Sequence, residues 1–479
     1  MYFTLYLEVV LQKLEKYLVV LLIACSGALL SYCAYYNEIW EGGGDNYWHY
    51  YFSKYAYQYP KFFLHHWGKP FFIFLSAPFS HFGFYGLNIF NILCGLGSAY
   101  VCYLYSKTLG FKASWLAPII LLFSVLYFLI LQSAMTEPLF SLLLILSSFL
   151  FYKEKYLWAS ILASFLIYSR SEGMLMIILF ACYLLLMRKW KFIPLMATAF
   201  SIYSFIGYFS GHDFLWFFTE NPYAEVSVYG HGTWSHFFEK YKAIFGLSHT
   251  LLLILGLLTL LILIVKNKAY NLRKPLQREA KVAFLLVVPA IVFFMFHVYA
   301  WAMGKYASGG LERVMSCILP CTALLSMYPI HIINTLNINK IVLSIFNVTL
   351  AFFLLREPFE TYHFPMPAWG PEKVEREASL WFKNVRLPNS MIYYAHPGIV
   401  FFCDEDPYNP DNKEAFAFPN DCEFKDYKHF YYVWDSQFSE SSCHHSLQSL
   451  KDCNKLKLIK SFDKDEYFKM YFFEFTPQK

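Results

Sequence analysis

Charged side chains are scarce in this sequence. Asp, Glu, Lys and Arg make up 15% of its 479 residues, while 57% are hydrophobic. Soluble domains carry about 25% charged residues. This composition argues against a soluble enzyme, a disordered chain, a collagen-like chain and a nucleic-acid-binding protein. The composition therefore indicates a membrane protein.

An internal repeat is also missing, since neither half of the sequence resembles the other. Transporters are typically built from repeats with broken helices, and they carry ionisable groups near the bilayer midplane. The absence of a repeat disfavours a lipid or glycan transporter or flippase. That class stays open as an alternative, together with a non-catalytic lipid-binding membrane protein.

What the sequence has in abundance is aromatic residues, at 21% of the chain, which suit a lipid–water boundary. Its charges are unevenly placed. Positions 356–479 hold 15 Lys and Arg against 20 Asp and Glu, whereas positions 1–355 hold 24 and 14. A basic, apolar part and an acidic, polar part predict two domains. We expect a transmembrane domain at 1–355 and a small soluble α/β domain at 356–479.

Apolar runs that approach the length of a membrane-spanning helix (about 20 residues) recur through the first part. The predicted spans are 17–36, 84–106, 114–132, 136–152, 155–169, 173–187, 190–209, 248–265, 281–301, 313–331 and 338–355. The predicted fold is thus a polytopic α-helical membrane protein with about 11 transmembrane helices. The region from the third to the sixth span leaves room for a miscount of one pair.

The short clusters of Lys and Arg predict the orientation of these spans. They fall at 107–112, 153–155, 188–191, 266–281 and near 340, which share one side if the N-terminus is cytoplasmic. The long aromatic loops and the tail then lie on the opposite side. The first span follows Lys13 and Lys16 and is too long for a typical signal peptide, so we expect an uncleaved anchor.

The sequence of the C-terminal part, 356–479, predicts a helix followed by strands. After Gly370 and Pro371, apolar residues at 374, 378, 381 and 385 keep a helical spacing. Apolar runs at 391–402, 429–434, 455–462 and 467–475 predict strands. Four cysteines lie in this part, and in an oxidising compartment they permit two disulfides with three possible connectivities. These are Cys403, Cys422, Cys443 and Cys453. Free or partly paired thiols are the alternative.

The first candidate site follows the first span. Gly42, Gly43 and Gly44 give the backbone access to positive φ and place Asp45 just outside the membrane. An aromatic stretch at 46–58, which includes Asn46 and His49, predicts a helix in the interface. A flexible exit turn with a solvated Asp45 is the alternative.

The same loop continues with His65, His66, Trp67 and Lys69. Tryptophan stacks on sugar rings and lysine attracts phosphate, so this group suits an anionic, sugar-bearing ligand. Two adjacent histidines also permit a metal site, although no further ligand for one is evident.

Isolated charges recur at the predicted external boundaries. Glu137 lies between apolar runs, where an ion that faces lipid costs about 2.5–3.5 kcal/mol or more, so it should face a polar cavity or a partner. Arg170 and Glu172 share a turn, and Arg313, with Lys305 nearby, opens the tenth span. Helix capping, a simple ion pair and snorkelling to lipid head groups are the respective structural alternatives. The convergence of these residues on one side favours a site.

Several short motifs together resemble the GT-C superfamily of polytopic glycosyltransferases. This superfamily includes protein O-mannosyltransferases, GPI mannosyltransferases and bacterial aminoarabinose transferases. The motifs are Gly-Asp within 42–46, Trp-Gly-Lys-Pro at 67–70, Thr-Glu-Pro-Leu-Phe at 136–140, Ser-Arg-Ser-Glu-Gly at 169–173, and Glu-Arg with a later Leu-Pro at 312–320. Their order and topology carry more weight than any one of them.

The resemblance implies an enzyme that takes a monosaccharide from a polyprenyl-phosphate donor, with a lipid, glycan or protein as acceptor. It implies Asp45 as the catalytic base, Arg313 and Lys305 on the leaving phosphate, and Glu137 and Arg170 as orienting groups. It also implies a bacterial inner membrane and no required cofactor, although a divalent metal held by acidic residues stays possible.

Overall fold

The computed structural model describes residues 2–477 apart from 223–226, 228, 268–276, 369, 389, 420–421, 425–427 and 465–467. Most of the predicted basic loop 266–281 thus lies outside the described residues. The chain forms two compact units. The first comprises Met1–Tyr36, Trp40–Gly42 and Phe52–Pro365, and the second comprises Asn37–Ile39, Gly43–Tyr51 and Met366–Lys479.

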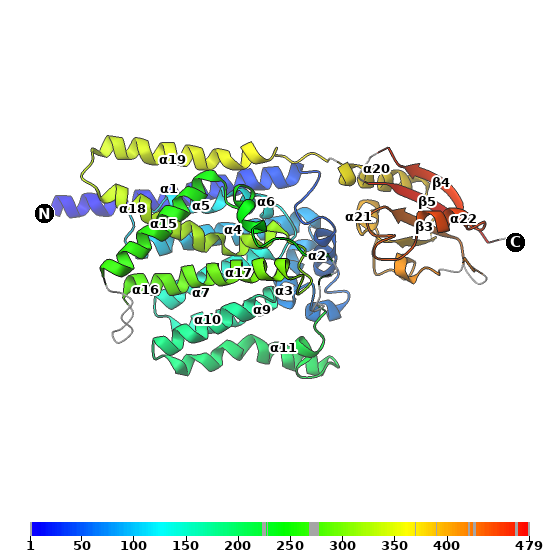
Figure 1. The fold of residues 1–479 in the computed structure, drawn as a ribbon, viewed down its shortest axis with the longest axis horizontal. Coiled ribbons are helices and arrows are strands. Elements are labelled where there is room, and N and C mark those ends of the chain that lie inside the picture. The colour runs from blue at the N-terminus through cyan, green and yellow to red at the C-terminus, as the bar shows by residue number, and fades with distance from the viewer. Residues whose placement is uncertain are drawn as a thin grey trace. The chain divides into compact units, whose positions relative to one another are not determined.

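The first unit is entirely helical among its described elements (Figure 1). Its elements are α1 (Tyr2–Tyr36), η1 (Pro60–Leu64), α3 (Pro70–Ser80), α4 (Gly83–Thr108), α5 (Leu116–Leu122), α6 (Val125–Ile130), α7 (Glu137–Tyr152), α8 (Tyr156–Ser164), α9 (Leu166–Ser169), α10 (Gly173–Leu186), η2 (Trp190–Ala197), α11 (Thr198–Phe209), α12 (Trp216–Thr219), α13 (His236–Glu239), α14 (Tyr241–Ile244), α15 (Leu247–Lys266), α16 (Arg278–Val282), the π-helical η3 (Ala283–Val287), α17 (Val288–Ala302), η4 (Glu312–Ile318), α18 (Leu319–Thr335) and α19 (Lys340–Thr361).

Seven helical segments within the described residues are long and apolar enough to cross a membrane. They are Leu14–Tyr36, Gly83–Thr108, Trp190–Phe209, Leu247–Lys266, Arg278–Ala302, Glu312–Thr335 and Lys340–Thr361. The chain is therefore an integral membrane protein. The other four predicted spans correspond to shorter helices, so the count of 11 spans stays a prediction.

The predicted span 114–132 is wrong as one continuous helix. The backbone of Ser124 is extended (φ −60°, ψ 132°), which separates α5 from α6. Its hydroxyl donates to the carbonyl of Ile120 at 2.8 Å and so competes with the backbone hydrogen bonds of a continuous helix. The span 155–169 corresponds to α8 and α9, which meet at Phe165 in a helical conformation and form one apolar helix, Tyr156–Ser169.

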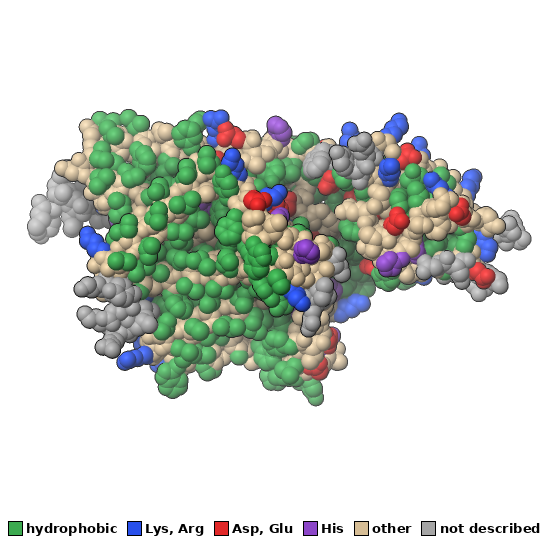
Figure 2. Space-filling model, in the orientation of Figure 1, with side chains coloured by type: hydrophobic (Ala, Val, Ile, Leu, Met, Phe, Trp, Pro, Cys, Tyr) green, Lys and Arg blue, Asp and Glu red, His purple; other side chains and the backbone are tan. Residues whose placement is uncertain are grey.

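The surface of the first unit differs between the sides and the ends of its helices. Figure 2 shows hydrophobic side chains covering the helices, with Lys and Arg gathered near helix ends. On α15, Leu251, Ile254, Leu258, Leu261 and Ile262 are each at least half exposed. An apolar face of this extent is expected where lipid replaces water.

Close helix packing fixes the interior of this unit. Helix α15 packs on α18, and a Cβ at Gly256 would lie 2.1 Å from the carbonyl oxygen of Leu325. Glycine is needed there because any side chain would push the two backbones apart. Helix α4 packs on α7, which carries the Glu137 of the candidate site.

The second unit holds most of α2 (Gly44–Lys54) and a mixed five-stranded sheet in the order β2-β1-β3-β5-β4. Its further elements are α20 (Gly370–Val385), β1 (Met391–Tyr394), α21 (Gly398–Cys403), β2 (Asn412–Glu414), η5 (Ala415–Ala417), β3 (Phe430–Asp435), α22 (Leu447–Asp452), β4 (Lys457–Phe462) and β5 (Met470–Phe475). Strand β1 is parallel to β2 and β3, and β5 is antiparallel to β3 and β4.

Most elements of this α/β unit match the sequence prediction. The predicted strand 391–402 is half wrong, because it becomes β1 and then α21, and β2 was not predicted. The predicted apolar stripe of α20 is confirmed in part: Ala378 is buried and Trp381 packs on Phe472, whereas Val385 is exposed. The buried residues of α20 are Glu375, Ala378, Ser379 and Phe382. Cys422 and Cys453 form a disulfide, while Cys403 and Cys443 are free thiols.

Candidate functional site

Among the described residues of the first unit, Glu137 is the most deeply buried acidic residue. It begins α7, and its side chain is 0% exposed. Arg170 lies at the end of α9 and places Nη1 2.7 Å from Glu137 Oε1. Thr136 makes no side-chain cap on α7, and its hydroxyl accepts instead from Arg170 at 3.3 Å. A buried carboxylate needs such a partner, because desolvation otherwise disfavours its charge.

The ion pair extends beyond Glu137. Arg170 Nη2 lies 2.8 Å from Glu172 Oε1, and His297 Nε2 of α17 lies 3.2 Å from the same oxygen. Burial raises the pKa of Glu172, but Arg170 and His297 outweigh that effect and hold the pKa well below its ordinary value. Glu172 is therefore ionised in the folded protein.

Arg313 joins this group from η4. Its side chain is 10% exposed, and its Nε lies 3.8 Å from Glu137 Oε1. The guanidinium thus faces inward, which argues against snorkelling to lipid head groups as its main role. Glu137 consequently lies between two arginines.

Lys69 approaches the same group from the start of α3. It is 4% exposed, and its Nζ donates to the hydroxyl of Ser171, between Arg170 and Glu172, at 2.8 Å. Burial lowers the pKa of Lys69 to about 7, and Glu172 counteracts that effect in part. We call Lys69, Glu137, Arg170, Glu172, His297 and Arg313 the buried charge cluster. Lys69, Arg170 and Arg313 bring three basic side chains to the acidic side chains of Glu137 and Glu172, which suits an anionic ligand.

His65 and His66 pack against aromatic rings outside the buried charge cluster, and their assignment to donor or acceptor binding stays a prediction. His65 stacks on Phe52 at 3.9 Å between ring centroids and accepts from the backbone amide of Gly68. His66 stacks on Phe217 and hydrogen-bonds to its carbonyl through Nε2 at 2.8 Å. Burial lowers the pKa of both imidazoles to about 4, so both are neutral near pH 7.

Two further predicted site residues of the first unit lie outside the cluster. Trp67 is half-buried and meets Phe52 edge to face at 6.0 Å. Lys305 lies in the turn after α17, and within the described part of the chain it makes no ion pair. Their assignment to substrate binding stays a prediction.

Asp45, Asn46 and His49 belong to the second unit. Gly42 and Gly43 have φ of 112° and 50°, as the glycine run predicts, and they turn the chain into α2. Asp45 lies in the first turn of α2 and is half-buried. Asn46 and His49 are 1% and 4% exposed. A carboxylate in this first turn is favoured by the helix dipole.

The sequence prediction missed His297 in the first unit. The signal was present, because His297 is an ionisable residue within a predicted span, and such residues seldom face lipid. Among the described residues, no group of three His, Cys, Asp or Glu side chains is arranged to hold a metal ion. Metal dependence thus stays a matter of prediction.

The helical unit and the small α/β unit share their fold with a membrane protein of known structure. The chain is similar to the crystal structure of ArnT from Cupriavidus metallidurans bound to undecaprenyl phosphate, with a TM-score of 0.62, 10% sequence identity, and coverage of 96% of this chain and 99% of ArnT. The apo state of the same protein gives a TM-score of 0.64 at 10% identity and the same coverage. No protein-family model and no curated protein sequence matches the chain. At this identity the similarity is one of fold.

Proposed function

We propose that this protein is a membrane glycosyltransferase that moves a monosaccharide from a polyprenyl-phosphate donor to an acceptor hydroxyl, with inversion at the anomeric carbon. The observation that carries this proposal is the fold, which is shared over 96% of the chain with an ArnT structure that holds undecaprenyl phosphate. We place the reaction at the extracytoplasmic face, since the predicted topology puts the candidate residues there.

The buried charge cluster supports the donor part of this proposal. Lipid phosphate is the leaving group, and cations stabilise the charge that develops on it. Arg313, Lys69 and Arg170 supply that charge, and Glu137 and Glu172 hold the two guanidinium groups in position. Lys305 is a further proposed phosphate ligand, on the evidence of its sequence position alone.

Asp45 is the proposed general base. In an inverting transfer a carboxylate takes the proton of the acceptor hydroxyl as it attacks the anomeric carbon. The start of α2 presents Asp45 half-buried, shortly after Gly42 and Gly43 with positive φ. No cofactor is needed for this chemistry, and a divalent metal stays compatible with it.

The test is transfer of radiolabelled sugar from a panel of undecaprenyl-phosphate hexoses, in proteoliposomes that contain membrane extract as acceptor. We expect D45N to lower turnover by about 10²–10⁴-fold, the usual contribution of a general base, with little change in the donor concentration that half-saturates the enzyme. D452N, the same change at the exposed end of α22, is the matched control.

Turnover of D45N equal to wild type removes Asp45 as the base. Movement of intact donor across the bilayer without sugar transfer supports the transporter alternative instead. Donor binding with neither activity supports a lipid-binding protein.

A further inference from the structure

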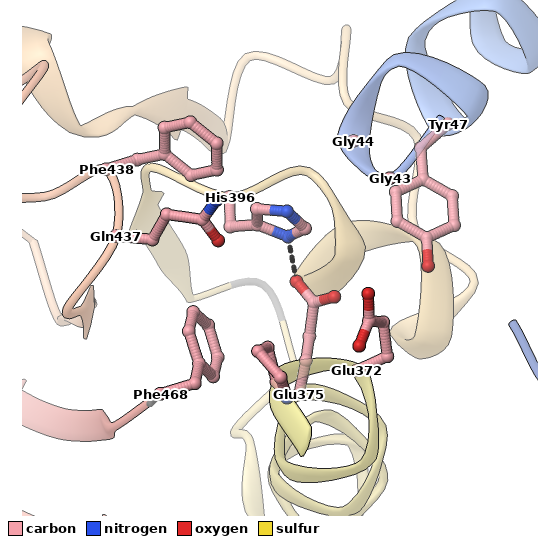
Figure 3. A pocket seen from close by; sticks show the side chains of 10 residues that line it. Gly43, Gly44, Tyr47, Glu372, Glu375, His396, Gln437, Phe438 and Phe468 are labelled. Carbon is pink, nitrogen blue, oxygen red and sulfur yellow. Dashed lines mark hydrogen bonds and ion pairs between the residues drawn. The ribbon is translucent and has the colours of Figure 1, made fainter. Parts of the chain in front are cut away.

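A pocket of about 100 Å³ lies wholly within the second unit and takes no part in the proposed transfer. The start of α2, the start of α20 and the segments that follow β1 and β3 enclose it (Figure 3). Gly43 and Gly44 form one wall with their backbone. A Cβ at Gly44 would come within 3.4 Å of His396 Nε2, so glycine keeps this wall open.

Two of the ionisable groups in the pocket neutralise each other. Glu375 is 2% exposed and hydrogen-bonds to His396 Nδ1, as the dashed line in Figure 3 marks. Burial lowers the pKa of His396, but Glu375 raises it by more, so the pKa lies above its ordinary value. The raised pKa favours a protonated His396 beside Glu375.

Glu372 is the remaining acid of the pocket, and burial raises its pKa while His396 offsets that effect only in part. Its Oε2 is enclosed, and among the described residues it has no hydrogen-bond partner. Figure 3 shows its carboxylate next to that of Glu375 and facing the hydroxyl end of Tyr47. A carboxylate in the first turn of α20 suits the helix dipole, which explains an acid at 372 but not its enclosure. Such a carboxylate is stabilised when a cation shares its surroundings.

Aromatic rings complete the walls. Tyr47, Phe438 and Phe468 line the pocket, and Phe438 stacks on His396 with 5.2 Å between ring centroids. Aromatic faces attract organic cations, and a carboxylate accepts hydrogen bonds from an ammonium group. A metal ion fits less well, because no set of three suitable ligands is arranged around one point among the described residues.

We propose that this pocket binds a primary ammonium group, with Glu372 as its counter-ion and the rings of Tyr47, Phe438 and Phe468 as its walls. The ammonium group comes from a lipid head group or from a soluble amine. The site does not depend on the glycosyltransferase proposal, since its readout is binding.

The test is isothermal calorimetry on the full chain in detergent, with propylammonium chloride as the probe at fixed ionic strength. Propan-1-ol has the same shape without the charge, and we expect it to bind about tenfold more weakly or worse, because a charge-assisted hydrogen bond is lost. E372Q should weaken propylammonium binding by a similar factor. E377Q, the same change on the exposed face of α20, should leave it unchanged.

Two results overturn the proposal: propan-1-ol binding as tightly as propylammonium to the wild type, or folded E372Q binding propylammonium like the wild type. If E372Q does not fold, the comparison of alcohol and amine on the wild type decides alone. Nanodiscs identify the source of the ammonium group. Weaker probe binding in phosphatidylethanolamine than in phosphatidylcholine discs, which have the same net charge but no primary ammonium group, assigns it to a lipid head group. Equal binding assigns it to a soluble amine.

Discussion

At the scale of single residues, the stability of the buried charge cluster depends on Glu137. It is fully buried, and Arg170 and Arg313 both direct guanidinium nitrogens at its Oε1. E137Q removes one partner of a buried pair, which typically costs about 3–5 kcal/mol because the other charge stays uncompensated. Thermal unfolding in detergent should therefore show a clear loss. E15Q breaks the exposed Glu15–Lys107 pair and should cost about 0–1 kcal/mol. Equal losses for both variants would contradict a desolvated cluster.

Lys69 should give donor binding a pH dependence. Its pKa of about 7 means that the ammonium form, which attracts phosphate, is lost as the pH rises from 6 to 8. The same lowered pKa affects folding. Between about pH 7 and the ordinary lysine pKa, the stability of the folded protein increases as the pH rises, because in this range the unfolded chain binds the proton of Lys69 more tightly.

K69R provides the reference, since arginine stays charged throughout this range. We expect the affinity of the wild type for undecaprenyl phosphate, relative to K69R, to fall about tenfold between pH 6 and 8. Taking this ratio cancels the titration of the phosphate itself. Parallel pH profiles for the two proteins would remove Lys69 from the phosphate site.

Individual site residues were predictable where the sequence isolates a charge between apolar runs. Glu137, Arg170, Glu172 and Arg313 were identified in this way, and the structure brings them together. The packing of His65 and His66 was not predictable, because their partners Phe52 and Phe217 are fixed only by tertiary contacts.

At the scale of elements, the turn between α9 and α10 holds Arg170 and Glu172 in place. A Cβ at Gly173 would lie 2.2 Å from the carbonyl carbon of Leu166. The backbones of α9 and α10 are therefore in close contact at this turn. G173A should destabilise the protein by about 1–3 kcal/mol or more, the range for overpacking, and should weaken donor binding because the turn shifts.

G97A is the matched control for this variant. Its Cβ would meet the flexible side chain of Leu142 at 3.3 Å, which can adjust. Both variants should be compared by thermal unfolding and by binding of undecaprenyl phosphate. Tolerance of alanine at both positions would show that the turn adapts without loss.

Helix boundaries were predictable only where capping or composition determines them. Helix α20 begins at Gly370, with Pro371 as its second residue, next to the predicted start. The break at Ser124 was not predictable from hydrophobicity, because a serine inside an apolar run is equally compatible with a continuous helix. Strand β2 was not predicted, because it is only three residues long. Its pairing with β1, like that of β1 with β3, depends on contacts between residues far apart in the sequence.

At the scale of the whole molecule, the sequence allowed three pairings of four cysteines and could not choose among them. The structure pairs Cys422 with Cys453 across 31 residues and leaves Cys403 and Cys443 as thiols. A disulfide forms and persists in an oxidising compartment, which agrees with the proposed extracytoplasmic position of the second unit. The Lys and Arg clusters of the predicted cytoplasmic loops support the same orientation, and this argument does not depend on the disulfide.

Membrane orientation is therefore the prediction that tests the proposal as a whole. Alkaline phosphatase, which is active only where its own disulfides form, should be active when fused after residue 479 and inactive when fused after Lys266. In intact cells, two of the four tail cysteines should resist maleimide until reductant is added. The opposite phosphatase pattern would place Asp45 and the second unit in the cytoplasm, where Cys422 and Cys453 would stay reduced. The enzyme would then need a donor that presents its sugar on the cytoplasmic leaflet, so the same two fusions decide which pool of lipid-linked sugar this protein can use.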